Sequence, residues 1–423
     1  MATLELQRPR GTQDILPKDS AKWQVVEAAA HRVAQSFGYA EVRTPTFEHV
    51  EVFRRGVGDA TDIVEKEMYE FKDHGDRDLV LRPESTAAVA RALLQASAFA
   101  EPPVRLYYMQ SHFRYERPQA GRLRQHTQFG VEVYGAGGPL ADAEVIALAQ
   151  SFLAELGLRN LSVRLNSIGD AQCRPAYRAA LVAHLEGHRE ELCADCQRRI
   201  ERSPLRVLDC KKEGCRRVVA EAPQPIDHLC EDCLRHLEGV EAALFALGIS
   251  YARDGSIVRG LDYYTRTVFE IQYAKLGAQS TVCGGGRYDG LVEALGGAPQ
   301  PGVGFGLGLE RLLLTLEEES LLPADRSAVD VFVAAIGEEL GNEALRIAQL
   351  LRGHGLRVEQ DILARSLKAQ LRRAQKVGVA KVVILGPQEF ARGVATVRDM
   401  VSSAQEEVPI DQLAARITAP VRE

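Results

Sequence analysis

The stretch from Arg105 to Tyr134 constrains the fold more than any other part of the sequence. It reads RLYYMQSHFRYERPQAGRLRQHTQFGVEVY and predicts two strands, Arg105–Arg114 and Gln125–Tyr134, joined by a polar loop that contains Pro and Gly. In the second strand, apolar residues at alternate positions place one face of the strand in a hydrophobic core. The opposite face then carries a row of mainly polar residues: His126, Gln128, Gly130, Glu132 and Tyr134.

This polar row predicts a binding face, because a sheet does not normally align Gln, Gly and Glu on one face without a ligand to hold. Gly130 leaves a gap between an amide and a carboxylate, through which a ligand can approach the backbone. Arg114 ends the first strand, and Arg117, Arg122 and Arg124 follow in the loop, so we expect anionic groups on that side. The alternative is a solvated antiparallel face with a charged hairpin tip.

The composition is typical of a soluble globular protein with several domains. The 423 residues correspond to about three domains, and 46% of them are hydrophobic and 26% charged. No apolar run approaches the roughly 18 residues of a membrane span, and the N-terminal residues contain no apolar signal core, which predicts a cytoplasmic protein without a membrane partner. The net charge of −6 does not favour nucleic-acid binding, but such binding follows local patches rather than totals.

The segment from about Gly169 to Gly248 differs from its flanks, since it is helical and charged and holds seven of the eight cysteines. Strand-like sequence resumes after it, which predicts an insertion within a larger domain. Residues 328–423 alternate apolar strands with amphipathic helices and predict a compact α/β module, which follows a linker that contains Pro323. The predicted parts are 1–168 and 251–325 for a divided core, 169–250 for the insertion and 328–423 for the C-terminal module.

Two glycine clusters invite comparison with nucleotide-binding loops. Cys283–Gly290 reads CGGGRYDG and Pro301–Gly308 reads PGVGFGLG, but neither has the G-x-G-x-x-G spacing, and no G-x-x-x-x-G-K-S/T occurs in the chain. Any nucleotide must therefore be held by antiparallel strands and arginines. The helix Leu309–Leu316 follows, with Arg311 off its apolar stripe, either as a ligand-binding residue or as an ordinary surface ion-pair residue.

Taken together, these segments resemble one known family. FRYERPQAGRLRQ and GLGLERL resemble motifs 2 and 3 of class II aminoacyl-tRNA synthetases. RGLDYYTRTVFE and CGGGRYDGL are similar to the two histidine-specific motifs of histidyl-tRNA synthetases, and RGTQDILP and LRPESTA also match that family. The resemblance covers essentially the whole chain. It implies an α+β fold with a six- or seven-stranded antiparallel sheet flanked by helices, a helical insertion, a C-terminal α/β anticodon-binding domain and a homodimer.

The resemblance also implies a reaction. ATP activates L-histidine to an enzyme-bound adenylate, with Mg²⁺ bridging the phosphates, and the histidyl group then passes to the 3′ end of tRNA(His). One competing interpretation is a histidine-sensing regulatory subunit of ATP phosphoribosyltransferase, which typically lacks the C-terminal module and the arginine-bearing histidine motif. This chain has both Arg259 and residues 328–423, which favours the ligase. A different class II synthetase with the same type of C-terminal domain is opposed by RGLDYY and GGGRYDG.

The motif match implies a histidine pocket whose polar groups read the substrate. Glu132 and Tyr264 are expected at the imidazole nitrogens, since a carboxylate and a phenol can match a donor and an acceptor. Ser85 departs from the usual glycine of the family and adds a hydroxyl near the amino group. Glu84, Thr86 and Gln128 are expected at the ammonium group of histidine. The full set of expected histidine-binding residues is Glu84, Thr86, Arg114, Gln128, Glu132, Arg259, Tyr263 and Tyr264.

The resemblance also implies that arginines act in catalysis and in the binding of ATP. Arg114 and Arg259 are the expected catalytic pair at the histidine carboxylate and α-phosphate, where two guanidinium groups preorganise the site for the developing charge. Arg311 is expected at the γ-phosphate and Glu116 at the adenine. The expected ATP-binding residues are Arg114, Glu116, Arg122 and Arg311.

Two C-x-x-C pairs in the insertion predict a structural zinc site formed by Cys193, Cys196, Cys230 and Cys233. The gap between the pairs is wider than the common spacing, and the chemistry of the family does not need zinc. The alternative is a set of reduced free thiols. The remaining cysteines are Cys210 and Cys215, which lie between the pairs, and Cys173 and Cys283, which look unrelated.

The C-terminal module contains a basic helix, Ser366–Lys376, with Lys368, Arg372, Arg373 and Lys376. Four basic residues in eleven also fit an ordinary solvated helix. Its place in a separate α/β module of a tRNA-charging family favours contact with RNA phosphates.

Overall fold

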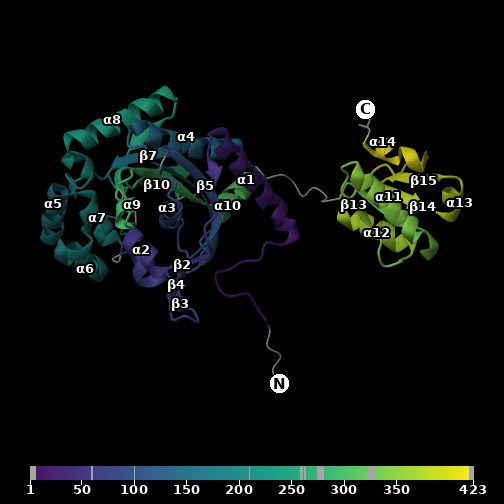
Figure 1. The fold of residues 1–423 in the computed structure, drawn as a ribbon, viewed down its shortest axis with the longest axis horizontal. Coiled ribbons are helices and arrows are strands. Elements are labelled where there is room, and N and C mark those ends of the chain that lie inside the picture. The colour runs from purple at the N-terminus through teal and green to yellow at the C-terminus, as the bar shows by residue number, and fades with distance from the viewer. Residues whose placement is uncertain are drawn as a thin grey trace, which may run out of the picture. The chain divides into compact units, whose positions relative to one another are not determined.

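The computed structural model describes residues 6–58, 61–99, 101–208, 210–257, 261, 263–273, 281–322 and 329–418. The chain forms two compact units, Met1–Leu322 and Pro323–Glu423 (Figure 1). Within the described residues, no helix combines the length and the apolar character needed to cross a membrane.

The larger unit is built on one sheet with the strand order β1-β5-β6-β11-β10-β9-β7-β8. The six inner strands are antiparallel, whereas β1 and β8 pair in parallel with their neighbours at the two edges. The expected antiparallel sheet of six or seven strands is present as these six strands, and the two short edge strands extend it to eight strands in the described residues. The strands are β1 (Ala40–Glu41), β5 (Val104–Phe113), β6 (Gln125–Tyr134), β11 (Gly302–Gly308), β10 (Thr281–Arg287), β9 (Thr265–Tyr273), β7 (Leu161–Ser167) and β8 (Tyr251–Arg253).

The predicted alternation along β6 is confirmed. Phe129, Val131 and Val133 are buried in the core on one face of the sheet, and Phe129 packs edge-on against Phe152 with ring centroids 4.8 Å apart. Tyr134 belongs to a second core on the opposite face. The first core is covered by α1 (Pro17–Ser36), α4 (Pro139–Glu155), α8 (Glu231–Ala246) and α10 (Leu309–Glu318).

The opposite face of the sheet is covered by shorter elements and holds most of the predicted site. Its core mixes aliphatic side chains with tyrosines from β5, β6 and the segments that flank β9 and β10. A small sheet with the order β2-β4-β3 leads into the helix α3. These elements are β2 (Phe47–His49), α2 (Val50–Val57), the short helix Ile63–Glu67, β3 (Tyr69–Lys72), β4 (Asp78–Leu81), α3 (Thr86–Gln95) and α9 (Leu291–Ala294).

The chain leaves the sheet between β7 and β8 and forms a group of helices, as predicted for the insertion. The first three long helices share a core of their own, whereas α8 returns to the core of the large sheet (Figure 1). Arg206 and Arg199 reach back to Asp62, with Nη2–Oδ2 distances of 2.5 and 3.1 Å. The helices are α5 (Arg174–Gly187), α6 (Ala194–Arg202), α7 (Glu213–Ala220), α8 and the short turns Arg189–Glu191, Pro204–Val207 and Pro225–His228.

The smaller unit is an α/β module with the strand order β13-β12-β14-β15-β16. Alternate residues of β12 enter two cores, one formed with α11 and α14 and one with α12. The predicted basic helix forms as α12, Leu367–Val377, and ends at Gly378, whose φ of 78° closes the helix. The other elements are β12 (Val331–Ala335), the short turns Glu338–Leu340 and Ile410–Gln412, α11 (Gly341–Gly353), β13 (Val358–Gln360), β14 (Lys381–Leu385), α13 (Pro387–Ala391), β15 (Val394–Asp399), β16 (Gln405–Pro409) and α14 (Leu413–Thr418).

Candidate functional site

Glu132 lies at the centre of the polar face of β6, with only 1% of its surface exposed. The Thr86 hydroxyl donates to its Oε1 at 2.8 Å, and the Tyr288 hydroxyl donates to its Oε2. Burial raises the pKa of Glu132 to about 8, although these two hydrogen bonds lower it. The carboxyl group can therefore take up or release a proton near neutral pH.

Glycines on the neighbouring strand make room for this carboxyl group. Gly304 of β11 lies directly opposite Glu132, and a Cβ at this position would lie 2.3 Å from Glu132 Oε2 and 2.9 Å from Tyr288 Oη. Any larger residue would displace the carboxyl group and its phenol partner. The glycine-rich strand thus leaves space for two buried polar side chains, Glu132 and Tyr288.

Gly130 does not leave the open gap that the sequence analysis expected. A Cβ on Gly130 would lie 2.4 Å from the ring of Tyr108, which lies opposite it on β5. The glycine therefore accommodates a buried tyrosine rather than a ligand. Sequence reasoning missed Tyr108 and Tyr288. The register between β5 and β6 places Tyr108 opposite Gly130, and this register is set by the length of the loop that joins the two strands.

Glu84 has a structural role that the sequence analysis did not anticipate. Its two carboxylate oxygens accept the backbone N–H groups of Thr86 at 2.7 Å and Ala87 at 2.9 Å, so Glu84 caps α3. Neither Ser85 nor Thr86 caps the helix with its side chain: Ser85 Oγ lies 2.7 Å from Nε2 of His112, and the Thr86 hydroxyl bonds to Glu132. Burial raises the pKa of Glu84, and the two backbone donors oppose that effect.

Tyr263 and Tyr264 join Tyr288 in one aromatic cluster. Their ring centroids lie 4.7 Å from each other and 5.5 and 6.4 Å from that of Tyr288. Because Tyr288 bonds to Glu132 and its ring lies near that of Tyr264, the structure brings the predicted pair Glu132 and Tyr264 into one buried cluster. Arg259, the other predicted catalytic residue, lies outside the described residues.

Arg114 and Gln128 lie at the loop end of the same strands. Arg114 donates from Nε to the carbonyl of Pro83 at 2.8 Å, and its charge lowers the pKa of Glu84 against the effect of burial. Gln128 is half-buried, and its amide lies over Gly306, where a Cβ would lie 3.3 Å from Nε2. Arg114 therefore lies near Glu84, and Gln128 lies on β6 on the glycine-rich side toward β11.

The predicted ATP residues gather where the β5–β6 loop meets α10. Arg122 Nη1 lies 3.8 Å from Glu116 Oε2, and a Cβ on Gly121 would lie 3.3 Å from Cβ of Arg311. Burial lowers the pKa of Arg311, the positive charge of Arg122 lowers it further, and Glu270 opposes both. The structure therefore adds Glu270, which sequence reasoning missed, to this group of charges.

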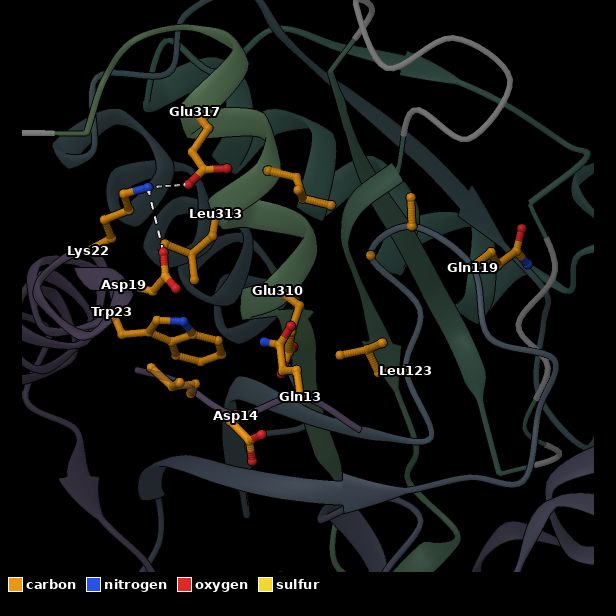
Figure 2. A pocket seen from close by; sticks show the side chains of 14 residues that line it. Gln13, Asp14, Asp19, Lys22, Trp23, Gln119, Leu123, Glu310, Leu313 and Glu317 are labelled. Atoms are coloured by element: carbon orange, nitrogen blue, oxygen red, sulfur yellow. Dashed lines mark hydrogen bonds and ion pairs between the residues drawn. The ribbon is translucent and has the colours of Figure 1, made fainter. Parts of the chain in front are cut away.

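A cavity of about 420 Å³ lies beside this loop, between the start of α1 and α10 (Figure 2). It contains none of the predicted site residues, and its charged lining is mainly acidic, with Lys22 bonded to Glu317 at 2.6 Å. An acidic lining disfavours phosphate. Its charged side chains are Asp14, Asp19, Lys22, Glu310 and Glu317.

The cysteines of the insertion form two clusters rather than the single predicted site. Cys193 and Cys196 begin α6, whereas Cys230 and Cys233 begin α8, so the two pairs belong to different parts of the fold. Cys173 is also part of a cluster, contrary to expectation. The groups are Cys193, Cys196, Cys210 and Cys215 in one, and Asp170, Cys173, Cys230 and Cys233 in the other.

Comparisons with known proteins agree with the motifs and the fold. A family model described as histidyl-tRNA synthetase matches residues 11–312, and one described as an anticodon binding domain matches residues 330–419. A histidine–tRNA ligase of Desulforamulus reducens is 50% identical over 97% of this chain and 99% of its own length. One from Moorella thermoacetica is 52% identical over 95% of this chain and 96% of its own.

A solved structure agrees as well. Apo histidyl-tRNA synthetase of S. aureus superposes with a TM-score of 0.82 at 37% identity, over 98% of this chain and 100% of that one. The match to the anticodon-binding model argues against the regulatory subunit, which typically lacks that module. The chain therefore belongs to the histidyl-tRNA synthetase family, the histidine–tRNA ligases among class II aminoacyl-tRNA synthetases.

Proposed function

We propose that this chain activates L-histidine with ATP and transfers the histidyl group to tRNA(His), using the pocket around Glu132. The observation that carries the proposal is a buried carboxyl group that accepts hydrogen bonds from two hydroxyl groups, those of Thr86 and Tyr288, among several buried tyrosines. An imidazole ring offers one donor and one acceptor, and such a pocket can satisfy both. Ligands that leave these polar groups unpaired are rejected.

Each end of histidine has its own proposed partners. Glu132 and Tyr264 read the ring, with Tyr263 beside them. Glu84, Thr86 and Gln128 hold the ammonium group, and the carboxyl group of Glu84 supports that assignment even though it also caps α3. The hydroxyl of Ser85 is bonded to His112 rather than free in the pocket, so this departure from the family pattern is accommodated.

The adenylation step is assigned to arginines. Arg114 borders the pocket near Glu84, and Arg259 is its proposed partner at the carboxylate and the α-phosphate, where both stabilise charge that develops during the reaction. Arg122 and Arg311 take the distal phosphates and Glu116 the adenine. Glu270, whose charge acts on Arg311, is a carboxylate that would hold the Mg²⁺ that accompanies ATP, and the ion would supply positive charge beside the phosphates.

The wider assignments follow from the family and are supported by the surface. A homodimer is supported by Phe47 and Phe71, which are 54% and 43% exposed on the small sheet of the single chain. A cytoplasmic location is supported by the eight cysteines, none of which is joined in a disulfide bond. The smaller unit is proposed to bind the anticodon of tRNA(His), and the insertion to contact its acceptor arm.

Histidine-dependent exchange of pyrophosphate into ATP, followed by charging of tRNA(His), tests the proposal. We expect exchange with histidine but not with other amino acids, and charging that depends on the cognate tRNA. A protein that binds histidine but catalyses neither step would be a regulator rather than a ligase.

A further inference from the structure

The two cysteine clusters have the dimensions of metal sites. In each cluster the four ligand atoms lie within 4.8 Å of one another. A tetrahedral zinc ion with zinc–sulfur bonds of about 2.3 Å requires sulfur–sulfur edges of about 3.8 Å. Cys173 Sγ and Cys230 Sγ lie 3.4 Å apart, close to such an edge and far beyond the roughly 2.05 Å of a disulfide bond.

The first cluster lies wholly within the insertion. Cys193 is the residue before α6, Cys196 is in its first turn, and Cys215 is in α7. The backbone N–H of Cys193 donates to Cys215 Sγ at 3.2 Å, a bond that suits a thiolate. Cys196 and Cys215 are fully buried in the core shared by α5, α6 and α7.

The second cluster lies where the insertion leaves and rejoins the large sheet. Cys173 precedes α5 and Cys230 precedes α8, and the backbone N–H of Cys230 donates to Cys173 Sγ at 3.3 Å. Asp170 Oδ1 accepts the N–H of Gln172 at 3.0 Å, which fixes the carboxylate toward the sulfurs. Gly169 has a φ of +67°, and a Cβ there would lie 3.1 Å from Cys173 Sγ, so the turn leaves room for the thiol.

We propose that the insertion binds two zinc ions, one in the Cys₄ cluster and one in the Asp–Cys₃ cluster. Cysteine thiolates and a carboxylate in a closed tetrahedral set are typical of structural zinc. Each C-x-x-C pair spans the start of a helix, α6 or α8, which holds its two thiols close to the other ligands of the cluster. The insertion has a small core of its own, and a metal ion compensates for a small core.

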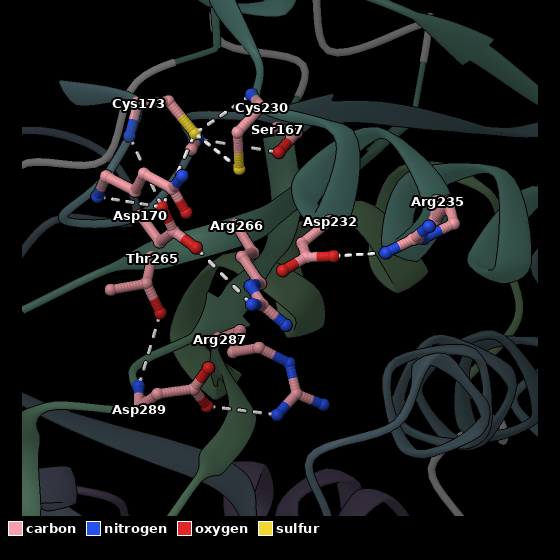
Figure 3. A network of polar contacts seen from close by, with 12 residues as sticks. Ser167, Asp170, Cys173, Cys230, Asp232, Arg235, Thr265, Arg266, Arg287 and Asp289 are labelled. Carbon is pink, nitrogen blue, oxygen red and sulfur yellow. Dashed lines mark hydrogen bonds and ion pairs between the residues drawn. The ribbon is translucent and has the colours of Figure 1, made fainter.

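The second ion would also fix one end of the proposed histidine pocket, an inference that rests on the proposed function. Asp170 Oδ2 lies 3.3 Å from Nη2 of Arg266, and the backbone N–H of Arg266 donates to Gly169 at 2.8 Å (Figure 3). Arg266 has a φ of +48°, unusual for a residue with a side chain, and therefore depends on these contacts. Arg174, the residue after Cys173, donates to the carbonyl of Tyr264.

Hydrogen bonds also connect the start of β9 to the segment that follows the neighbouring strand β10. Thr265, between Tyr264 and Arg266, accepts the backbone N–H of Asp289 at 3.2 Å, and Asp289 in turn bonds to Arg287 at 3.0 Å (Figure 3). The zinc ligands, the start of β9 and the segment after β10 thus form one connected network. Losing the second ion should therefore loosen the tyrosines that line the pocket.

Metal content of the full chain tests the two sites. Protein purified under reducing conditions without chelators should contain two zinc ions per chain by mass spectrometry, with no stoichiometric iron. Cys210→Ala and Cys230→Ala, both at half-buried positions in different clusters, should each lose one zinc ion. Cys283→Ala, which removes a thiol outside both clusters, should keep both ions.

The proposal would be wrong if the wild-type chain took up no zinc even when zinc is supplied. It would also be wrong if the wild-type chain bound a single zinc ion and both Cys210→Ala and Cys230→Ala lost it. Cobalt substitution gives a readout that does not depend on full stability. Thiolate-to-cobalt absorption should fall in both variants and should change its band shape in Asp170→Asn alone, because only one cluster contains an oxygen ligand. An identical spectrum in Asp170→Asn would remove Asp170 from the site.

Kinetics test the link to the pocket separately from the metal count. In pyrophosphate exchange, Cys230→Ala should raise KM for histidine severalfold and leave KM for ATP unchanged, whereas Cys210→Ala should leave both unchanged. Equal histidine KM values in the two variants would overturn the link. If no variant or wild-type chain catalyses exchange, the proposed function fails, and the zinc count still decides the two sites.

Discussion

The hydroxyl of Tyr288 donates a hydrogen bond to the carboxyl group of Glu132, and both side chains are almost completely buried. The two residues are far apart in the sequence but come from strand β6 and from the end of β10, on either side of β11. Gly304 on β11 leaves the space in which they meet. One hydrogen bond thus joins the central strand to the glycine-rich motif that follows the insertion.

Replacing Tyr288 by Phe should weaken histidine recognition. The hydrogen bond from Tyr288 lowers the pKa of Glu132, so its loss favours the protonated carboxyl and leaves one buried oxygen without its donor. An unsatisfied buried group costs about 1–3 kcal/mol, and we expect KM for histidine to rise about tenfold or more. Tyr134→Phe is the control, since Tyr134 bonds at 3.3 Å to the backbone carbonyl of Thr86. Equal effects of the two changes would argue against a specific role for Tyr288.

Glu132→Gln and Tyr264→Phe should weaken histidine binding and spare ATP. Each change keeps the shape of the side chain and alters the hydrogen bonding that reads the ring. Isothermal titration with each ligand separates the two affinities. A loss of ATP affinity without a loss of histidine affinity would mean that the pocket is assigned to the wrong substrate.

Glu132 should also make the unliganded protein less stable as pH rises. Its pKa is about 8 in the folded chain, against 4.5 for the ordinary carboxyl group, so the folded state holds the proton more tightly. The stabilisation is complete below pH 4.5, decreases as the unfolded state releases its proton, and is lost by about pH 8. Urea unfolding at pH 5.5 and pH 8 should show a free-energy difference that shrinks in Glu132→Gln. An unchanged difference would mean that Glu132 is already ionised at pH 5.5.

Arg259→Ala should fold normally and lose most adenylation. The guanidinium group is proposed to act on charge that appears only in the transition state, so kcat should fall more than KM rises. Loss of one such donor costs about 10²–10³ in rate. Single-turnover formation of histidyl-adenylate measures the step directly. Near-normal exchange of pyrophosphate would remove Arg259 from the mechanism.

Local patterns in the sequence predicted the parts of the fold that depend on local order. Alternation along Gln125–Tyr134 assigned Phe129, Val131 and Val133 to one face of β6 and Tyr134 to the other. The change in composition at about Gly169 predicted a helical insertion, and helices do form between β7 and β8. What was missed depends on contacts between distant segments. The ring of Tyr108 fills the space over Gly130 only because β5 and β6 pair in one register, which the sequence does not state.

The grouping of the cysteines also depends on contacts between distant segments, which the sequence pattern does not reveal. The two C-x-x-C pairs look equivalent in the sequence and invite a single site, but each begins a different helix. Cys173 looked unrelated because its partner, Cys230, lies at the far end of the insertion. Glu84 was expected to serve a ligand, yet its carboxylate also caps α3. A carboxylate can cap a helix or bind a ligand, and a thiol can belong to one cluster or another; the contacts made in the folded chain determine which.

The smaller unit should be dispensable for adenylation and required for charging. A chain that ends at Leu322 keeps every described residue of the proposed pocket, so exchange of pyrophosphate should survive if its dimer does. Charging of tRNA(His) should fall strongly, because anticodon contacts are lost. Full charging by the truncated dimer at physiological salt would show that this unit is not the tRNA reader.

Within that unit, α12 offers a sharper test. Lys368, Arg372 and Lys376 are exposed, whereas Arg373 is paired with Glu359 at an Nε–Oε1 distance of 2.6 Å. The three exposed cations are available to RNA phosphates, and each one that contacts a phosphate contributes about 0.7 to the salt dependence of binding to unpaired RNA. Replacing all three by Ala should weaken tRNA binding and flatten its dependence on salt, while Arg373→Ala should change both less. If the triple variant and Arg373→Ala behave alike, the basic face of α12 does not contact the tRNA, and the unit must bind it through another surface.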